Sequence, residues 1–235
     1  MFASSLFILL LLKYGFNISR YTKIFLLSSV GLLIGGNVFG LLSGLYSALA
    51  NGEPINLSTF TNTGFVFYGG LIGFILAFLL LCKVWDKTID YKIMDLVTVT
   101  IPLFHTFGRL GCFFAGCCYG IETNSAFSIL YTNRVSGEVI TATRVPIQLI
   151  ESSGNMLIFV ALLILLIKQK YRNHLLLLYL STYAIMRIII EFFRGDLQRG
   201  VWNNISFSQF LSVVILISCA MIMMRTAKER KNENH

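Results

Sequence analysis

Six long apolar stretches divide this 235-residue chain, and they limit its possible folds more than any other feature. They run over residues 24–46, 64–82, 93–113, 146–167, 174–192 and 204–224. A helix rises about 1.5 Å per residue, so each stretch is long enough to cross roughly 30 Å of hydrocarbon. Hydrophobic residues make up 56% of the chain and charged residues 13%, which excludes an ordinary soluble domain.

A shorter apolar stretch, Phe2 to Leu12, precedes Lys13 at the start of the sequence. It has no basic leader of the kind found in signal peptides, and its positive charges follow it. We interpret it as a shortened first span. The sequence therefore predicts an all-α polytopic membrane protein of about seven transmembrane helices, forming a single domain over residues 1–235.

The segments between these stretches alternate in positive charge. The lysine-rich connections carry Lys13, Arg20 and Lys23; Lys83, Lys87 and Lys92; Lys168, Lys170 and Arg172; and Arg225, Lys228, Arg230 and Lys231. The opposite set, residues 47–63, 118–145 and 193–203, contains no lysine and four arginines. Because basic loops stay in the cytoplasm, the pattern predicts an external N-terminus and a cytoplasmic C-terminus. The net charge of +8 is thus accounted for by orientation, and we expect no nucleic-acid partner.

Residues 105–120, with the sequence HTFGRLGCFFAGCCYG, place polar chemistry inside a stretch otherwise suited to lipid. The segment holds an arginine, a histidine, three cysteines and four glycines. A charge at membrane depth costs roughly 2.5–3.5 kcal/mol, and broken backbone survives there only when buried in protein or lining a polar cavity. The segment therefore indicates a functional site that contains Arg109.

The histidine and cysteines of this segment leave several interpretations open. His105 is either a packing residue or a base. The spacing of Cys112, Cys117 and Cys118 does not match a paired zinc knuckle, so the sequence predicts no metal ligand and no cofactor. The charge pattern places these cysteines toward the outer side, where a disulfide is chemically permitted.

The apolar stretch over residues 174–192 leads into MRIIIEFFRGD, where the spacing predicts charged residues on one helix face. Arg187, Glu191 and Arg194 follow one another at i, i+4 and i+7. A guanidinium group matches phosphate bidentately, so two arginines around one acid favour an anion site. A structural ion pair that joins helices is the alternative.

A polar stripe opens the apolar stretch that follows Arg144. Pro146 suits the first turn of a helix, and Gln148, Glu151 and Asn155 come after it at i, i+3 and i+7. The stripe predicts either hydrogen bonds to neighbouring helices or direct contact with a ligand.

Glycines in two other stretches are spaced for close helix packing. Gly69 and Gly73 form one small-xxx-small pair. A second run has the same spacing: Gly36, Gly40 and Gly44. Tyr68 precedes the first pair, and its phenol is a candidate for a cavity that these glycines border; Asn37 is a similar candidate.

At these residues the chain resembles the prolipoprotein diacylglyceryl transferase family. Its motifs appear in the family's order: FYGGLIGF at 67–74, GRLGCFFAGCCYG at 108–120, RVPIQLIE at 144–151, RIIIEFFRGD at 187–196 and ISFSQFLS at 205–212. Five motifs in order over nearly the whole chain make the resemblance specific.

The resemblance implies a multi-pass enzyme of the bacterial inner membrane. Such an enzyme moves the diacylglyceryl group of phosphatidylglycerol to the cysteine thiol of a lipoprotein precursor and releases glycerol phosphate. The implied catalytic residues are Arg109, Arg187, Glu191 and Tyr68. The implied substrate-binding residues are Arg144, Gln148, Glu151, Arg194, Cys112, Cys117, Gly69 and Gly70.

The chain also departs from the family pattern near the expected site. Tyr68 stands where the family usually has histidine, and Cys112 and Cys117 stand for its asparagine and glutamate; Ala115 and Asn37 also differ. These changes leave two alternatives: a family paralogue with another acceptor, such as a glycan or small molecule, or a non-catalytic lipid-binding protein. A transporter would predict internal repeats or matched broken helices, and we see none.

Overall fold

A computed structural model describes residues 2–52, 54–55, 65–86, 90–135, 138–171, 173–195, 201–202 and 205–233. Three basic residues used for orientation, Lys87, Arg172 and Arg199, lie outside this part of the chain. The chain divides into two compact units. Unit 1 comprises Met1–Thr100 and Gln198–Phe207, and unit 2 comprises Ile101–Leu197 and Ser208–His235.

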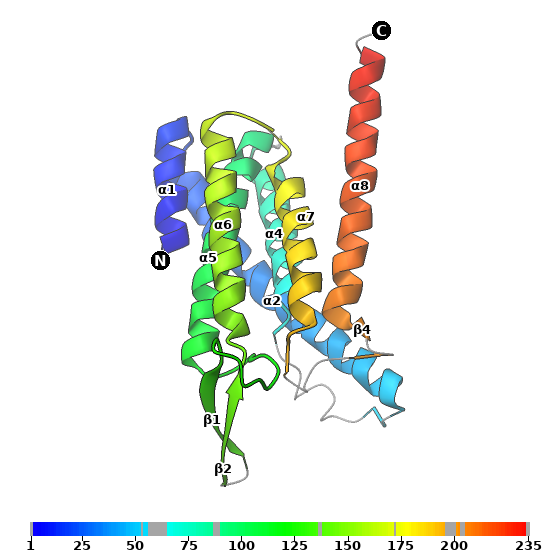
Figure 1. Ribbon diagram of the computed structural model, residues 1–235. Coiled ribbons are helices and arrows are strands. Elements are labelled where there is room, and N and C mark those ends of the chain that lie inside the picture. Colours follow the sequence, from blue (N-terminus) through cyan, green and yellow to red (C-terminus); the bar gives the residue numbers. More distant parts are fainter. Residues whose placement is uncertain are drawn as a thin grey trace. The chain divides into compact units, whose positions relative to one another are not determined.

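Helices dominate the described residues, in agreement with the predicted all-α polytopic class. They are α1 Phe2–Tyr14, α2 Ile18–Asn51, α4 Phe67–Asp86, α5 Tyr91–Phe114, α6 Ile147–Ile167, α7 Leu175–Glu191 and α8 Phe207–Glu233 (Figure 1). Each coincides with one of the apolar stretches. Five of them, α2, α4, α5, α6 and α8, are long and apolar enough to cross a membrane. With 17 residues, α7 is slightly shorter, and α1 with 13 residues is the shortened element that the sequence predicts.

Glycines bring α2 and α4 together within unit 1. A methyl group added at Gly35 would overlap the backbone of Gly69, and one added at Gly31 would meet the backbone carbonyl of Gly73. The predicted packing role of Gly69 and Gly73 is therefore confirmed. Their partners on α2 are Gly31 and Gly35, which do not belong to the glycine run that the sequence analysis selected on this helix. Gly36, which does belong to that run, lies against the ring of Phe65.

Gly35→Ala tests this contact, because the atoms that a new methyl would meet are backbone atoms that cannot rotate away. We expect a loss of about 1–3 kcal/mol of stability, the usual cost of overpacking. The melting temperature in detergent micelles measures it. Gly108→Ala is the matched control, since its added methyl has no neighbour within 4 Å among the residues that the structure describes. An equal loss of melting temperature in the two variants would contradict the contact.

Two small antiparallel hairpins were not predicted. In unit 2, β1 Ile129–Val135 pairs with β2 Glu138–Arg144, and the hairpin lies between α5 and α6 along the chain (Figure 1). In unit 1, β3 Val201–Trp202 pairs with β4 Ile205–Ser206. The segments ILYTNRV and EVITATR are rich in β-branched and aromatic residues, which favour strands. The sequence analysis treated residues 118–145 only as a connection and so missed them.

Candidate active site

A buried carboxylate from α6 lies at the centre of a charged cluster in unit 2. One oxygen of Glu151, Oε2, lies 2.7 Å from Nη2 of Arg109 on α5 and 3.6 Å from Nη1 of Arg187 on α7. The Glu151 side chain is 1% exposed, and the two arginine side chains are 11% and 6% exposed. Since burying an unpaired charge is expensive, these ion pairs are what allows the residues to stay inside the protein.

The end of α7 supplies a second acid to the same cluster. Arg187 Nη2 lies 2.9 Å from Glu191 Oε2, one helical turn along α7, and donates a hydrogen bond to Ser208 Oγ at 3.3 Å. The helical i, i+4 spacing of Arg187 and Glu191 is therefore confirmed. The prediction that Arg194 shares their helix face is wrong, because α7 ends at Glu191 and Arg194 lies beyond it in a backbone bridge. Helices α6 and α7 lie side by side, which brings Glu151 within reach of Arg187 (Figure 1).

The other oxygen of Glu151 faces two aromatic side chains. His105 Nε2 lies 3.6 Å from Oε1, and the hydroxyl of Tyr183 donates to the same oxygen at 3.4 Å. The rings of His105 and Tyr183 lie 5.0 Å apart, centre to centre. Sequence reasoning missed Tyr183, although it precedes Arg187 by four residues and shares its helix face. His105 is thus in contact with the cluster, and a role as a base stays a prediction.

The predicted polar stripe on α6 faces the protein interior. Gln148 accepts a hydrogen bond from the hydroxyl of Tyr131 at 2.9 Å and donates one to the carbonyl of Cys117 at 2.6 Å. Burial raises the pKa of Tyr131, so its phenol stays a donor at neutral pH. Ser152 and Thr106 exchange hydrogen bonds with each other's carbonyls, at 3.1 and 3.4 Å, and so join α6 to α5. The stripe acts as a scaffold for Glu151.

Backbone hydrogen bonds fix the loop that follows α5. The amide of Gly120 donates to Val145 O at 2.9 Å, and the amide of Gly195 donates to Tyr119 O at 3.1 Å. A Cβ at Gly120 or Gly195 would overlap neighbouring backbone, so both positions require glycine. The loop is therefore held between the start of α6 and the segment after α7, where Arg194 forms a backbone bridge with Gly120.

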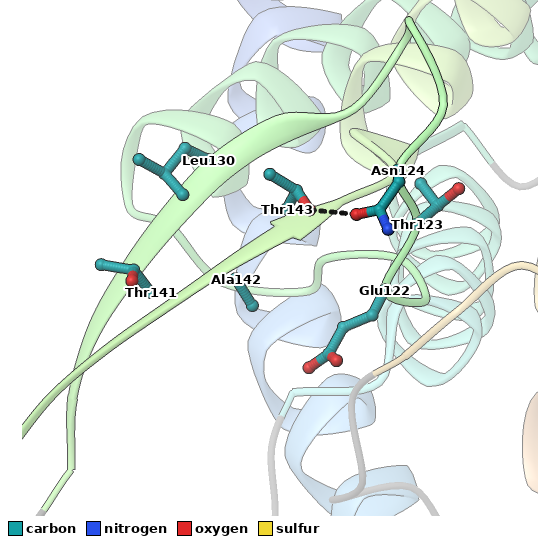
Figure 2. Close-up of a pocket in the computed structure, with 7 residues that line it drawn as sticks. All are labelled: Glu122, Thr123, Asn124, Leu130, Thr141, Ala142 and Thr143. Carbon is teal, nitrogen blue, oxygen red and sulfur yellow. Dashed lines mark hydrogen bonds between the residues drawn. The ribbon is translucent and has the colours of Figure 1, made fainter.

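Arg144 lies at the rim of this region. Its Nη2 is 2.5 Å from Glu122 Oε1, and its guanidinium lies 4.4 Å from the centre of the Tyr119 ring. Glu122 is 67% exposed, so this pair is in contact with solvent. Beside it, a hollow of about 450 Å³ is open along the β1–β2 hairpin (Figure 2). It is lined by Glu122, Thr123, Asn124, Leu130, Thr141, Ala142 and Thr143.

Two buried arginine nitrogens in the charged cluster indicate that it can bind an anion. Arg109 Nε and Arg187 Nη1 are buried, and no described residue accepts a hydrogen bond from either atom. Buried donors are almost always satisfied, so such atoms need an explanation. An anion with several oxygens would accept from both, and guanidinium groups suit phosphate in particular.

The three cysteines of the predicted segment converge after α5. The Sγ atoms of Cys112, Cys117 and Cys118 all lie within 4.8 Å of one another. None of them forms a disulfide in the structure. Burial, and next the neighbouring thiol of Cys118, raises the pKa of Cys117.

Three predicted site residues belong to unit 1. Tyr68, Gly69 and Gly70 lie in the first turns of α4, and Tyr68 is 2% exposed. A Cβ at Gly70 would lie 2.8 Å from the ring of Phe65, which gives this glycine a packing role. A role for these three residues toward a substrate stays a prediction.

Comparison with known proteins places the chain in a family. The family model described as prolipoprotein diacylglyceryl transferase matches residues 3–225. The phosphatidylglycerol-prolipoprotein diacylglyceryl transferase of Clostridium tetani is 31% identical over 207 residues, which cover 87% of this chain and 80% of that protein. The second enzyme of this name from Clostridium perfringens is 30% identical over 206 residues, which cover 86% of this chain and 77% of that protein. The Helicobacter hepaticus protein of the same name is 34% identical over 178 residues, which cover 74% of this chain and 57% of that protein. With most of its length matched, the chain belongs to the prolipoprotein diacylglyceryl transferase family.

Proposed function

We propose that this chain transfers the diacylglyceryl group of phosphatidylglycerol to the cysteine thiol of a lipoprotein precursor and releases glycerol phosphate. The relatives' names give phosphatidylglycerol, a prolipoprotein and the transferred diacylglyceryl group. The observation that carries it here is the pair of buried arginine donors, Arg109 Nε and Arg187 Nη1, beside a fixed carboxylate. Two such donors fit the phosphodiester of a lipid headgroup.

The proposed reaction forms a thioether and breaks a phosphate ester. The acceptor sulfur, as thiolate, attacks the terminal glyceryl carbon, and the bond between that carbon and the phosphate oxygen breaks. The electron pair leaves with the glycerol phosphate oxygen. Arg109 and Arg187 stabilise the negative charge that develops there, and fixed donors do so without reorganisation.

The surrounding residues hold these arginines in position. Glu151 orients both guanidinium groups, and Glu191 and Ser208 fix Arg187 further. Gln148 ties α6 to the cysteine loop through Cys117 O. By family resemblance, Arg144 and Arg194 are proposed substrate contacts. The same resemblance proposes a catalytic role for Tyr68.

The proposed setting is the bacterial inner membrane. Five helices are long and apolar enough to span it, and α1 and α7 complete seven proposed crossings. The alternation of lysine-rich connections places the N-terminus outside and the C-terminus in the cytoplasm. The charged cluster would then lie toward the outer leaflet, within one transferase domain over residues 1–235.

A defined assay tests the transfer. Purified protein in phosphatidylglycerol vesicles receives a synthetic lipoprotein-precursor peptide, and mass analysis follows the products. We expect a peptide heavier by one diacylglyceryl group and a matching amount of glycerol phosphate. A peptide with serine in place of its cysteine is the control, and we expect it to stay unmodified.

Two other outcomes would contradict the proposal. The substitutions at Tyr68, Cys112 and Cys117 favour an altered acceptor, so glycerol phosphate release with another acceptor but not with the peptide would identify a paralogous activity. Lipid binding without turnover of any acceptor would identify a non-catalytic member.

A further inference from the structure

The thiols of Cys112, Cys117 and Cys118 lie close together, and no ion pair described in the charged cluster involves them. Cys112 lies in the last turn of α5, and the other two follow it in the loop. Their three sulfur atoms lie within 4.8 Å of one another. Zinc–thiolate bonds are about 2.3 Å long, so sulfurs sharing one tetrahedral zinc ion lie roughly 3.8 Å apart. The sulfur–sulfur distances in the structure are thus at most about 1 Å longer than such a site requires.

The backbone of this loop is shaped in a way that keeps the sulfurs together. Cys118 has a φ of +60°, in the left-handed region that non-glycine residues rarely adopt, and Gly116 has a φ of +66°. A residue held there costs about 1–3 kcal/mol, and such residues occur often at ligand sites. The hydrogen bond from Gln148 to Cys117 O, at 2.6 Å, and the bonds of Gly120 hold the loop on either side of Cys118.

We propose that Cys112, Cys117 and Cys118 bind one zinc ion through their thiolates and leave its fourth position open to a thiol. Zinc is the fitting cation because it favours tetrahedral sulfur ligation and has no redox chemistry. Cys117 is exposed and the other two thiols are partly exposed, so the fourth position is accessible. Three protein ligands with one open position are typical of catalytic rather than structural zinc sites.

The site adjoins the charged cluster in sequence and in space. Arg109 precedes Cys112 by one turn of α5, and its guanidinium interacts electrostatically with Cys112 and Cys118. Three thiolates around a divalent cation carry a net charge of −1, and the nearby arginine offsets it. The spacing along α5 thus puts the proposed ion about one helical turn from Arg109, which is proposed to bind the phosphate.

An acceptor role for this zinc ion rests on the proposed transferase function. An incoming cysteine thiol would displace water from the fourth position and lose its proton to solvent, because a zinc-bound thiol is deprotonated. The resulting thiolate is the nucleophile that the transfer requires. The substitution of Cys112 and Cys117 for the family's usual residues would then replace one means of thiol activation with another.

Metal binding is measured first, without any reference to activity. Full-length protein is purified in micelles under reducing conditions, stripped with a chelator and titrated with Zn²⁺ or Co²⁺. We expect one ion per chain by elemental analysis and thiolate-to-cobalt charge-transfer absorption. Replacing all three cysteines by serine should abolish both signals, and Cys117→Ser alone should weaken binding by more than about 100-fold, the upper range for outer-shell changes.

The control variant changes the two cysteines outside this loop, Cys82 on α4 and Cys219 on α8, to alanine. Both are buried, at 1% and 3% exposure, so we expect full metal binding. Substoichiometric metal in the wild type, or equal binding in the triple serine variant, would overturn the zinc site. So would a disulfide among the three cysteines in protein alkylated before extraction.

Transfer activity then separates the zinc site from the proposed function. We expect metal-free protein to lose transfer to the peptide and to regain it with Zn²⁺. Zinc binding with no transfer under any condition would overturn the transferase function and leave the zinc site standing. Full transfer by metal-free protein would overturn the acceptor role alone.

Discussion

Arg109→Lys is expected to reduce diacylglyceryl transfer by about 100- to 1,000-fold, the usual cost of removing a donor that stabilises transition-state charge. The guanidinium uses Nη2 to pair with Glu151 and keeps Nε as a buried donor. An ammonium group is a single point of charge and cannot serve both positions at once. Initial rates of glycerol phosphate release in phosphatidylglycerol vesicles measure the effect.

Arg225→Lys is the matched control for this variant. Arg225 is an exposed residue of α8, so the same substitution there should leave the rate unchanged. The amount of folded protein is compared by gel filtration before each assay. A folded Arg109→Lys protein with the wild-type rate would remove Arg109 from the phosphate role.

Glu151→Gln should destabilise the protein by about 3–5 kcal/mol, the cost of breaking a buried ion pair. The carboxylate is 1% exposed and faces Arg109 and Arg187, so its loss leaves two buried positive charges with less compensation. The melting temperature in micelles should fall, and the yield from membranes should fall with it. Adding Arg109→Gln to this variant should restore part of the loss, because it removes one of those charges.

Glu122→Gln provides the contrast in burial. Its carboxylate also pairs with an arginine, Arg144, but it is 67% exposed. Exposed pairs contribute about 0–1 kcal/mol, so the melting temperature should change little. Equal decreases in melting temperature in the Glu151→Gln and Glu122→Gln variants would show that burial does not determine how much these ion pairs stabilise the protein.

Local patterns in the sequence predicted the features that depend on neighbours along the chain. Apolar stretches long enough to span a membrane located the seven described helices, and the i, i+4 spacing located the Arg187–Glu191 pair. The family resemblance was confirmed by the match over residues 3–225. These predictions succeeded because helix periodicity and hydrophobic length are properties of short segments.

Features that join distant segments were not predictable in the same way. Arg109 and Glu151 were each selected as site residues, but their ion pair joins two helices and has no signature in spacing. The convergence of the three cysteine sulfurs depends on a left-handed backbone turn at Cys118. The glycines of α2 that meet α4 are Gly31 and Gly35, which the spacing argument did not select.

The arrangement of the buried charges also bears on how the chain enters the membrane during synthesis. Arg187 and Glu191 neutralise each other within α7, so that helix carries its own counter-charge into the bilayer. Arg109 and Glu151 come from α5 and α6, which leave the ribosome one after the other and can insert as a hairpin with its charges matched. An unmatched charge would cost roughly 2.5–3.5 kcal/mol at the translocon. Each of these two ion pairs is therefore close to electrically neutral, and the contact of Arg187 with Glu151 requires α7 as well as α6.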